Sequence, residues 1–327
     1  MSDVALVAGV SHQTVSRVLN TPDAVRETTR ERVTQAMAEL GYRPNLAARA
    51  LARARSPLLG VISAGEARFG PTHALHAVEE AAQAAGYIST HVPAISPTQA
   101  REATDHLFSV GVAGIVVVAP THELADRIVA RRRDTPVVLI AAGAPISEGV
   151  SVVAVDQELG ARLAVRHLAE LGHTRIHHLS GPPRWFDAHT RVIGWQEECH
   201  ALGLEQGLLV EGGWDAADGF AATNRLLAAG ASVEAIFAAN DLMALGAIRA
   251  LRMRGLDVPG DVSVVGFDDA EGTDFYLPPL TTVRQPFAHV GRLAIEVLLT
   301  MLDGESATSR SPEPELVVRE SAASPRR

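Results

Sequence analysis

The side chains best suited to bind another molecule lie near the N-terminus, on one face of a short predicted helix. This helix begins at Ser11, whose hydroxyl can accept a hydrogen bond from a free backbone N–H, and it runs to about Leu19. Val15, Val18 and Leu19 recur at helical spacing and predict its buried face. The opposite face is polar and consists of His12, Gln13, Ser16, Arg17 and Asn20.

These side-chain types match the chemistry of DNA. Arg17 can donate two hydrogen bonds to guanine O6 and N7, and Gln13 can bond adenine N6 and N7. Hydroxyl groups suit phosphate oxygens, which position a protein without specifying sequence. The candidates for phosphate contact are Ser11, Thr14, Ser16 and Thr29. Taken alone, the same residues also fit a solvated polar face on a small helical cap.

Two further helices are predicted around this one. Residues 2–8 form the first helix, Gly9-Val10-Ser11 forms a tight turn, and residues 27–40 form a third helix that Gly41 ends. Two short helices joined by a glycine turn predict a helix-turn-helix, whose second helix lies in the DNA major groove. Residues 1–56 carry a net charge of +3 in a chain of net charge −9, which favours contact of this segment with an anion.

From Pro57 onward, short apolar runs alternate with amphipathic helices. The runs predicted as strands are 58–62, 114–119, 137–141, 152–155, 176–179, 208–210, 235–238, 262–267 and 281–283. Helices are predicted between them, for example at 72–85, 159–171, 241–254 and 288–302. Buried strands separated by helices indicate parallel sheets, and so many strands indicate two α/β lobes. One more strand-like run, 315–318, precedes a polar end that we expect to be disordered.

The composition excludes several classes of protein. The chain has 327 residues, 47% hydrophobic and 20% charged, as in an ordinary globular protein and unlike a disordered one. No apolar run reaches the roughly 18 residues of a membrane-spanning helix, and the first residues do not resemble a signal peptide. Cys199 is the only cysteine, which excludes an internal disulfide and a cysteine-based zinc site. We therefore expect a cytoplasmic protein with no contact to a membrane.

The order of the sequence motifs resembles one family closely. VALVAGVSHQTVSRVLN, followed by TRERVTQAMAELGYRPN, is similar to the DNA-binding head of the lactose-repressor (LacI/GalR) family. The body resembles the sugar-binding core of that family in LGHTRIHHLSGPP, RVIGW, ANDLMALGAIRAL, VPGDVSVVGFDD and YLPPLTTVRQPF. The resemblance spans roughly residues 1–305. It implies an all-α helix-turn-helix headpiece followed by a two-lobed α/β core like that of the type I periplasmic binding proteins.

The resemblance assigns DNA contacts residue by residue. The base-reading positions of the family fall on His12, Gln13 and Arg17. Its hinge helix begins at Asn45 and carries Arg49 as a further candidate DNA contact. Leu51 occupies the position of the apolar wedge that kinks DNA from the minor groove, although a hydrophobic anchor on the body is the alternative.

Two positions depart from the DNA-binding pattern of the family. Met1-Ser2 stand before Asp3, where the family has a Thr and an apolar residue, which leaves open whether the natural chain starts upstream of Met1. Arg26 stands where a capping Ser or Thr is common. Both departures bear on the affinity for DNA rather than on the class of protein.

The resemblance also implies a sugar site between the lobes. Arg191, Asn240 and Asp268 fall on ligand positions of the family, and such side chains can donate to and accept from sugar hydroxyls. Trp214 and Phe287 match aromatic positions that pack on a sugar ring. Further candidates for this site are Ala64, Phe69, Trp185 and Asp187.

Simpler roles remain open for several of these residues. Asp268 can instead cap a helix, Trp185 can equally be core, and Trp195 is more typical of core packing. The groups His73/His76 and His173/His177/His178 have metal-like spacing, but no nearby carboxylate set completes a site, so we expect neither a metal nor a cofactor. Two N-lobe regions that carry polar ligand residues in the family are apolar here, so the sugar, such as a β-glycoside or a disaccharide, stays unidentified.

The sequence therefore predicts a repressor of carbohydrate-utilisation genes that binds a palindromic operator as a homodimer, since no leucine heptad follows Gly304. The alternatives are a sugar-binding protein of a transport system, and an enzyme, for which no phosphate-binding, nucleophile-elbow or dinucleotide motif is found. The expected boundaries are a headpiece at 1–44, a hinge at 45–56, a core at 57–320 and a disordered tail at 321–327. Within the core we expect an N-lobe of about 57–155 and 286–314 and a C-lobe of about 156–283 and 315–320.

Overall fold

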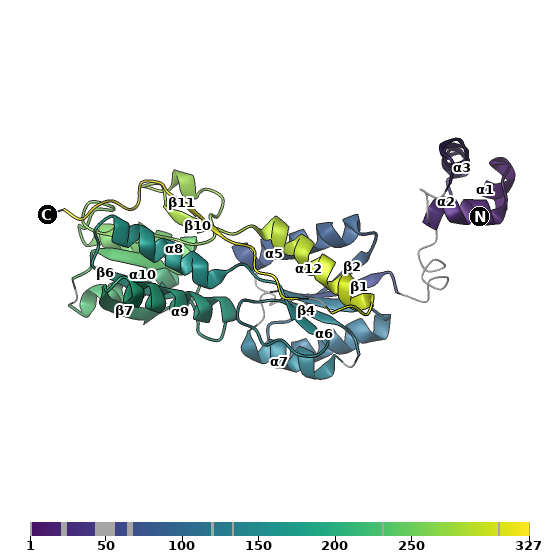
Figure 1. Ribbon diagram of the computed structural model, residues 1–327. Helices are drawn as coiled ribbons and strands as arrows, with labels where there is room; N and C mark the ends of the chain where they lie inside the picture. Colours follow the sequence, from purple (N-terminus) through teal and green to yellow (C-terminus); the bar gives the residue numbers. More distant parts are fainter. Residues whose placement is uncertain are drawn as a thin grey trace. The chain divides into compact units, whose positions relative to one another are not determined.

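The computed structural model describes residues 2–20, 25–42, 56–63, 68–118, 121–132, 134–230, 232–306 and 308–326 (Figure 1). The chain divides into two compact units, residues 1–56 and 57–327, each with its own hydrophobic core.

The smaller unit consists of three helices, α1 (Ser2–Val7), α2 (His12–Asn20) and α3 (Glu27–Glu39). Their apolar sides meet in a core that contains Val4, Val15, Val18, Val33 and Ala36. The bounds lie within about one residue of the sequence prediction, because Gly and Ser mark the turn and the apolar spacing marks the buried faces.

The turn between α1 and α2 is fixed by one glycine and one arginine. Gly9 has a φ of 61°, in the left-handed region that glycine adopts without strain. The guanidinium of Arg32 on α3 donates to the carbonyl oxygens of Ala8 and Gly9. The third helix therefore holds the first two in their relative orientation.

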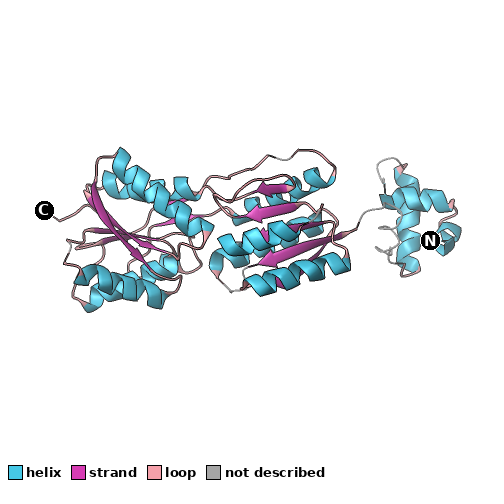
Figure 2. Ribbon diagram, turned by 90° about the horizontal axis from the view of Figure 1, so that it is seen from below, coloured by secondary structure: helices cyan, strands magenta, loops and turns pink. Residues whose placement is uncertain are grey.

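The N-lobe of the larger unit is built on a parallel sheet in the order β2-β1-β3-β4-β5 (Figure 2). Its strands are β1 (Leu58–Ser63), β2 (Ile88–Pro93), β3 (Gly114–Val118), β4 (Val137–Ile140) and β5 (Val150–Val152). One face is covered by α5 (Phe69–Ala84) and α12 (Phe287–Leu302), and the other by α6 (Pro97–Val110) and α7 (His122–Arg131). Because helices cover both faces, strands such as β3 are apolar throughout rather than alternating.

The C-lobe repeats this arrangement with a sheet in the order β7-β6-β8-β9. Its strands are β6 (Arg175–Ser180), β7 (Glu205–Glu211), β8 (Ala235–Ala238) and β9 (Ser263–Val265). The flanking helices are α8 (Gln157–Glu170) with α9 (Phe186–Ala201), and α10 (Ala216–Ala228) with α11 (Asp241–Met253). A 3-10 turn (Thr273–Phe275) and an antiparallel pair, β10 (Thr282–Arg284) with β11 (Glu315–Val317), complete the lobe.

The predicted disordered tail is wrong for residues 321–326. Ser321 is fully buried, and its hydroxyl donates to the carbonyl of Val264 at 2.6 Å while accepting from the N–H of Thr281 at 2.8 Å. Ala323 N–H donates to the hydroxyl of Ser263 at 3.0 Å. Hydrogen bonds to neighbouring strands, rather than apolar packing, order this segment. A hydropathy pattern detects only apolar packing, so it could not predict this order.

The sequence prediction also missed β2. Its residues, Ile-Ser-Thr-His-Val-Pro, lie at the edge of the sheet and are exposed or half-buried, so they lack the apolar run that marked the other strands.

Among the described residues, no helix combines the length and apolar character needed to cross a bilayer.

Candidate functional site

A cavity of about 140 Å³ lies between the two lobes of the larger unit. A bound water needs roughly 10–15 Å³ by the same measure, so the cavity has space for a small organic molecule. The N-lobe lines it mainly with apolar groups: Phe69, Ala74, Ile140, Ala141, Val155, Phe287 and Val290. The C-lobe lines it mainly with polar and aromatic groups: Gln157, Trp185, Asp187, Arg191, Trp214, Asn240, Asp241 and Asp268.

Arg191, on the second turn of α9, is the centre of the polar wall. Its Nε donates to Gln157 Oε1 at 2.8 Å, Nη1 donates to the carbonyl of Ala239, and Nη2 lies 3.7 Å from Asp268 Oδ1. Its guanidinium also lies 3.8 Å from the centre of the Phe267 ring. Burial lowers the pKa of Arg191, and the nearby carboxylates of Asp268, Asp187 and Asp241 oppose this change.

Asp268 closes a ring of buried side chains with Arg191. Gln285 Nε2 donates to Asp268 Oδ1 at 2.7 Å, and Gln157 Nε2 donates to Gln285 Oε1 at 2.7 Å. Burial raises the pKa of Asp268 to about 6, although Arg191 and the Gln285 hydrogen bond favour its charged form. Gln157 and Gln285 flank the segments where the chain passes from one lobe to the other, so the ring joins the cavity to these crossings.

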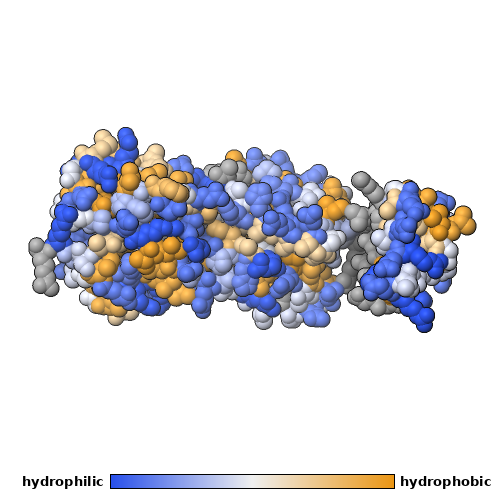
Figure 3. Space-filling view, turned by 90° about the horizontal axis from the view of Figure 1, so that it is seen from above, coloured by the Kyte–Doolittle hydropathy of each residue, from blue (hydrophilic) through white to orange (hydrophobic). Residues whose placement is uncertain are grey.

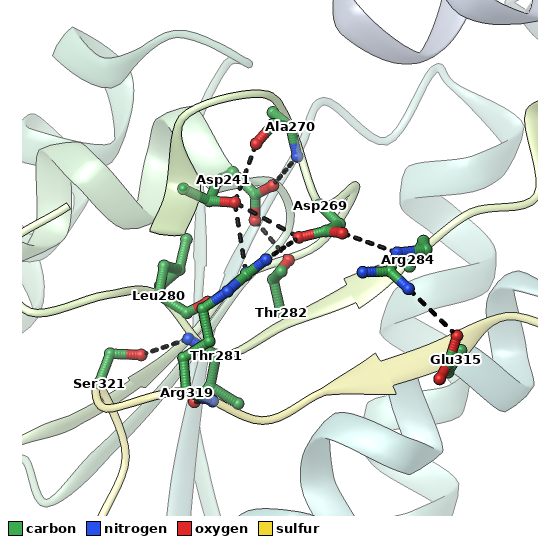
Figure 4. A network of polar contacts seen from close by, with 11 residues as sticks. Asp241, Asp269, Ala270, Leu280, Thr281, Thr282, Arg284, Glu315, Arg319 and Ser321 are labelled. Carbon is green, nitrogen blue, oxygen red and sulfur yellow. Dashed lines mark hydrogen bonds and ion pairs between the residues drawn. The ribbon is translucent and has the colours of Figure 1, made fainter. Parts of the chain in front are cut away.

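The adjacent carboxylates of Asp268 and Asp269 have separate surroundings. Both residues have positive φ values, 112° and 54°, which L-residues adopt only at some cost. Asp269 accepts from Arg284 and from Arg319, each at 2.7 Å, and these hydrogen bonds together with both charges lower its pKa despite the opposing effect of burial (Figure 4). Asp268 thus faces the cavity, whereas Asp269 fixes the C-terminal segment.

Asn240 and Asp241 begin α11 at the edge of the cavity. Asn240 Oδ1 accepts from Met243 N–H at 2.8 Å, and its Nδ2 donates to the carbonyl of Trp214 at 2.9 Å. Asp241 accepts from the Thr282 hydroxyl at 2.5 Å and from Ala270 N–H at 2.7 Å. Burial and the neighbouring Asp268 raise the pKa of Asp241 well above its usual value.

Aromatic side chains lie at the cavity from both lobes. Trp185 and Trp214 of the C-lobe are almost fully buried and meet edge to face, with ring centres 6.1 Å apart. Among the described residues, neither indole N–H has a hydrogen-bond partner. Phe69 and Phe287 of the N-lobe lie 6.0 Å apart. Such rings can pack on the C–H faces of a ligand ring.

Trp195 has the core role expected for it. Its ring is 1% exposed, and its N–H donates to the carbonyl of Ile176 at 3.0 Å. His173, His177 and His178 are also buried and bonded, for example His177 Nε2 to the Ser232 carbonyl at 3.0 Å. Burial is the main cause that lowers the pKa of each, that of His178 to about 4, so these imidazoles are neutral near pH 7. The described part of the chain contains no group of three or more potential metal-ligating side chains.

The first turn of α9 also contacts the N-lobe. Phe186 belongs to the N-lobe core and stacks on His122, with ring centres 3.8 Å apart. His122 N–H donates to the carbonyl of Arg184 at 3.0 Å. Across the cavity rim, Arg68 of the N-lobe donates to Asp215 of the C-lobe at 3.1 Å. The lobes therefore contact each other beside the cavity, both at the first turn of α9 and across the cavity rim.

In the smaller unit, α2 presents the predicted polar face. Ser11 accepts from Thr14 N–H at 3.1 Å, as its predicted capping role requires, and Val15 and Val18 are buried. His12, Gln13 and Arg17 are exposed, and Thr14, Ser16 and Thr29 are half-buried. Arg26 precedes α3 without a side-chain capping bond.

Some predicted residues cannot be placed. Asn45, Arg49, Leu51 and Ala64 lie outside the described residues, as does the side chain of Asn20. The sequence analysis did not identify Gln157, Gln285, Asp241, Asp215 or Arg68 as cavity residues. Arg68, Asp215 and Asp241 gave a usable signal, since each is adjacent in sequence to a residue already predicted for the site.

Comparison with known proteins identifies both units. Residues 1–45 match the model described as bacterial regulatory proteins, lacI family, and residues 165–322 match a periplasmic binding protein-like domain. The lactose operon repressor of Escherichia coli (strain K12) is 35% identical over 326 residues, which cover 99% of this chain and 90% of that protein.

Two solved structures agree over 98% of both chains. The crystal structure of the lac repressor dimer bound to operator and the anti-inducer ONPF is 34% identical, with a TM-score of 0.80. The complex of the transcriptional regulator CelR with cellobiose is 32% identical, with a TM-score of 0.74. The resemblance seen in the sequence and the predicted fold class are thereby confirmed. The chain belongs to the lacI family of bacterial regulatory proteins.

Proposed function

We propose that the protein is a transcriptional repressor whose affinity for operator DNA is set by a small sugar bound between its lobes. The observation that carries this proposal is that one chain joins a helix-turn-helix to a cavity lined by Arg191, Asp268 and four aromatic rings. Arginine and carboxylate groups recognise hydroxyls, and aromatic rings pack on sugar faces. The similar regulators, bound to operator or to cellobiose, support both halves of the proposal.

The DNA contacts are assigned to α2 and the hinge. Exposed His12, Gln13 and Arg17 read base edges, and the hydroxyls of Ser11, Thr14, Ser16 and Thr29 bind phosphates. Asn45, Arg49 and Leu51, which lie outside the described residues, are the further DNA contacts that we propose. The protein then works in the cytoplasm, where the DNA is.

The acting form is a homodimer on a palindromic operator. An apolar surface that fits this role is exposed on the C-lobe, where Leu242, Leu245, Phe275 and Leu277 are 41%, 38%, 83% and 73% exposed. The hydrogen bond from Ala270 N–H to Asp241 holds the two elements that carry these residues together. Figure 3 shows apolar surface gathered in several places over this lobe. The similar lac repressor structure is described as a dimer.

Effector binding can be tested through intrinsic fluorescence. Two of the three tryptophans line the cavity, so a bound sugar changes their emission, and Trp195→Phe removes the core background. Titration with mono- and disaccharides, together with thermal unfolding, identifies the ligand, because a ligand at 100 times its Kd stabilises the folded state by about 2.7 kcal/mol. If no sugar changes fluorescence or unfolding, the sugar effector is wrong.

DNA binding separates this function from its alternatives. Fluorescence anisotropy with DNA from upstream of the protein's own gene, against a shuffled duplex, measures operator preference at fixed salt. A sugar-binding transport protein or an enzyme binds neither duplex specifically. Equal affinity for both duplexes therefore contradicts the repressor function.

A further inference from the structure

Asp187, the second residue of α9, connects the cavity to the opposite lobe. Its carboxylate lines the cavity, and its Oδ1 accepts the N–H of Ala142, which follows β4 of the N-lobe, at 3.0 Å. One turn later, the Thr190 hydroxyl donates to the carbonyl of the same Ala142 at 3.2 Å. A side chain that a ligand can touch is therefore bonded directly to the N-lobe backbone.

The cavity contains more carboxylates than cations. Its described lining includes Asp187, Asp215, Asp241 and Asp268 against Arg68 and Arg191. Arg68 is paired with Asp215, and every donor nitrogen of Arg191 faces Gln157, Ala239 or Asp268. An arriving anion thus meets no unoccupied guanidinium along the described wall.

Asp187 and Asp241 are the two carboxylates of this set that have no ion-pair partner among the described residues, and Asp187 accepts one hydrogen bond where Asp241 accepts two. No cationic group of the described residues lies within 4.0 Å of Asp187, and its one hydrogen bond is to Ala142 N–H. Enclosure by both lobes raises the pKa of Asp187, and the charge of Arg191 only partly offsets this effect. Asp187 is half-buried, and a carboxylate partly shielded from bulk water is stabilised by further hydrogen-bond donors and destabilised by another negative charge.

We propose that Asp187 restricts the effector to uncharged, hydroxyl-rich ligands and ties the bound ligand to the N-lobe. This inference rests on the proposed function, since it specifies the chemistry of the same site. A ligand hydroxyl donates to Asp187 while the Ala142 N–H stays bonded, so ligand, α9 and the end of β4 form one chain of hydrogen bonds. A phosphate or carboxylate on the ligand is repelled at the same point.

The test compares ring-matched neutral and anionic probes on the full-length protein. The pairs are methyl β-glucoside with methyl β-glucuronide, methyl β-galactoside with methyl β-galacturonide, and cellobiose with its 6-phosphate; inorganic phosphate serves as the anion alone. Wild type binds at least one neutral probe, and its anionic partner binds at least about tenfold more weakly. Because a hydrogen bond to a charged group contributes strongly to binding, Asp187→Asn lowers the affinity for the neutral probe by about 10- to 100-fold. It also brings the affinities for the neutral and the anionic probe of that pair closer together.

Thr190→Val is the matched control, because it removes the neighbouring bond to Ala142 without changing charge. It leaves the neutral-to-anionic ratio unchanged. An anionic probe that binds wild type as tightly as its neutral partner overturns the inference. So does a ratio that Asp187→Asn leaves intact.

A measurement without ligand separates this inference from the proposed function. If no probe of either charge binds, the proposal of a sugar effector is contradicted. The charge state of Asp187 is then tested through the pH dependence of the unfolding free energy. Because the folded protein holds the proton of Asp187 more tightly than the unfolded chain, wild type loses stability relative to Asp187→Asn as pH rises above about 4. Arg191, Asp241 and Asp268, the charged groups around it, are present in both proteins. Parallel unfolding curves from pH 4 to 8 overturn the inference.

Discussion

Arg191 donates hydrogen bonds to Gln157 and Ala239 and pairs electrostatically with Asp268, three partners from different parts of the chain. Only part of these surroundings could therefore be predicted from the sequence. Arg191 and Asp268 fall on ligand positions of the family that the sequence resembles, so their place in the site could be inferred from the sequence. Gln157 and Gln285 are 128 positions apart, and each could equally be a surface residue. Their pairing depends on how the crossings between the lobes lie in space, which no local pattern specifies.

Arg191→Lys tests the fork geometry of this site. A lysine cannot donate to Gln157 and Ala239 while facing Asp268, so buried acceptors lose their donors. We expect the free energy of unfolding to fall on the order of 3 kcal/mol in urea denaturation. Arg131→Lys, in the exposed pair with Asp105, is the control and costs less than about 1 kcal/mol. Equal losses in the two variants contradict the assigned role of Arg191.

The raised pKa of Asp268 predicts a pH dependence of stability. Its pKa is about 6 in the folded protein, above the value of about 4 in the unfolded chain. The stabilising contribution is therefore complete below pH 4 and is lost as pH rises through 6. Measured from pH 4 to 8, the unfolding free energy of wild type falls relative to that of Asp268→Asn. A difference that grows in the opposite direction is incompatible with this assignment.

At the scale of elements, hydropathy predicted what is buried by apolar packing and missed what is held by hydrogen bonds. The strands Gly114–Val118 and Ala235–Ala238 are apolar runs covered on both faces, and both were predicted to within a residue. The edge strand Ile88–Pro93 and the ordered segment 321–326 are polar, and both were missed. In each, backbone hydrogen bonds to a neighbouring strand replace the apolar signal.

Ser321→Ala tests the hydrogen bonding of the C-terminal segment. The change leaves Thr281 N–H and the Val264 carbonyl without their partner in a fully buried position. We expect a loss of about 1–3 kcal/mol in unfolding free energy. Ser324→Ala, three residues later at an exposed position, is the control and changes stability by less than about 0.5 kcal/mol. A disordered tail would make the two variants alike.

Gln13→Ala tests the recognition role of α2. Loss of a bidentate adenine contact lowers operator affinity by about 1–3 kcal/mol, and affinity for a shuffled duplex stays nearly constant. Gln35→Ala, the same exchange at an exposed position of α3, is the control. Anisotropy titrations at one salt concentration measure both duplexes. A uniform loss on the two duplexes by Gln13→Ala assigns this residue to the phosphate backbone instead.

At the scale of the whole molecule, the account depends on a free-energy coupling between two sites on one chain. Trp185 directly precedes α9, and Asp187 and Arg191 on this helix also line the cavity, whereas Phe186 and Thr190 of the same helix contact the N-lobe. A ligand that binds one arrangement of the lobes more tightly therefore shifts the population of that arrangement. The N-lobe connects directly to the hinge in sequence, so such a shift can change the cost of DNA binding.

The most direct test of this coupling is the operator affinity of the full-length protein with and without the sugar that stabilises it. Both titrations use the same salt concentration and a saturating sugar. The account predicts that the operator Kd changes by about 5- to 150-fold, corresponding to a coupling of roughly 1–3 kcal/mol, while affinity for a shuffled duplex is unaffected. An operator Kd that stays the same at saturating sugar contradicts it.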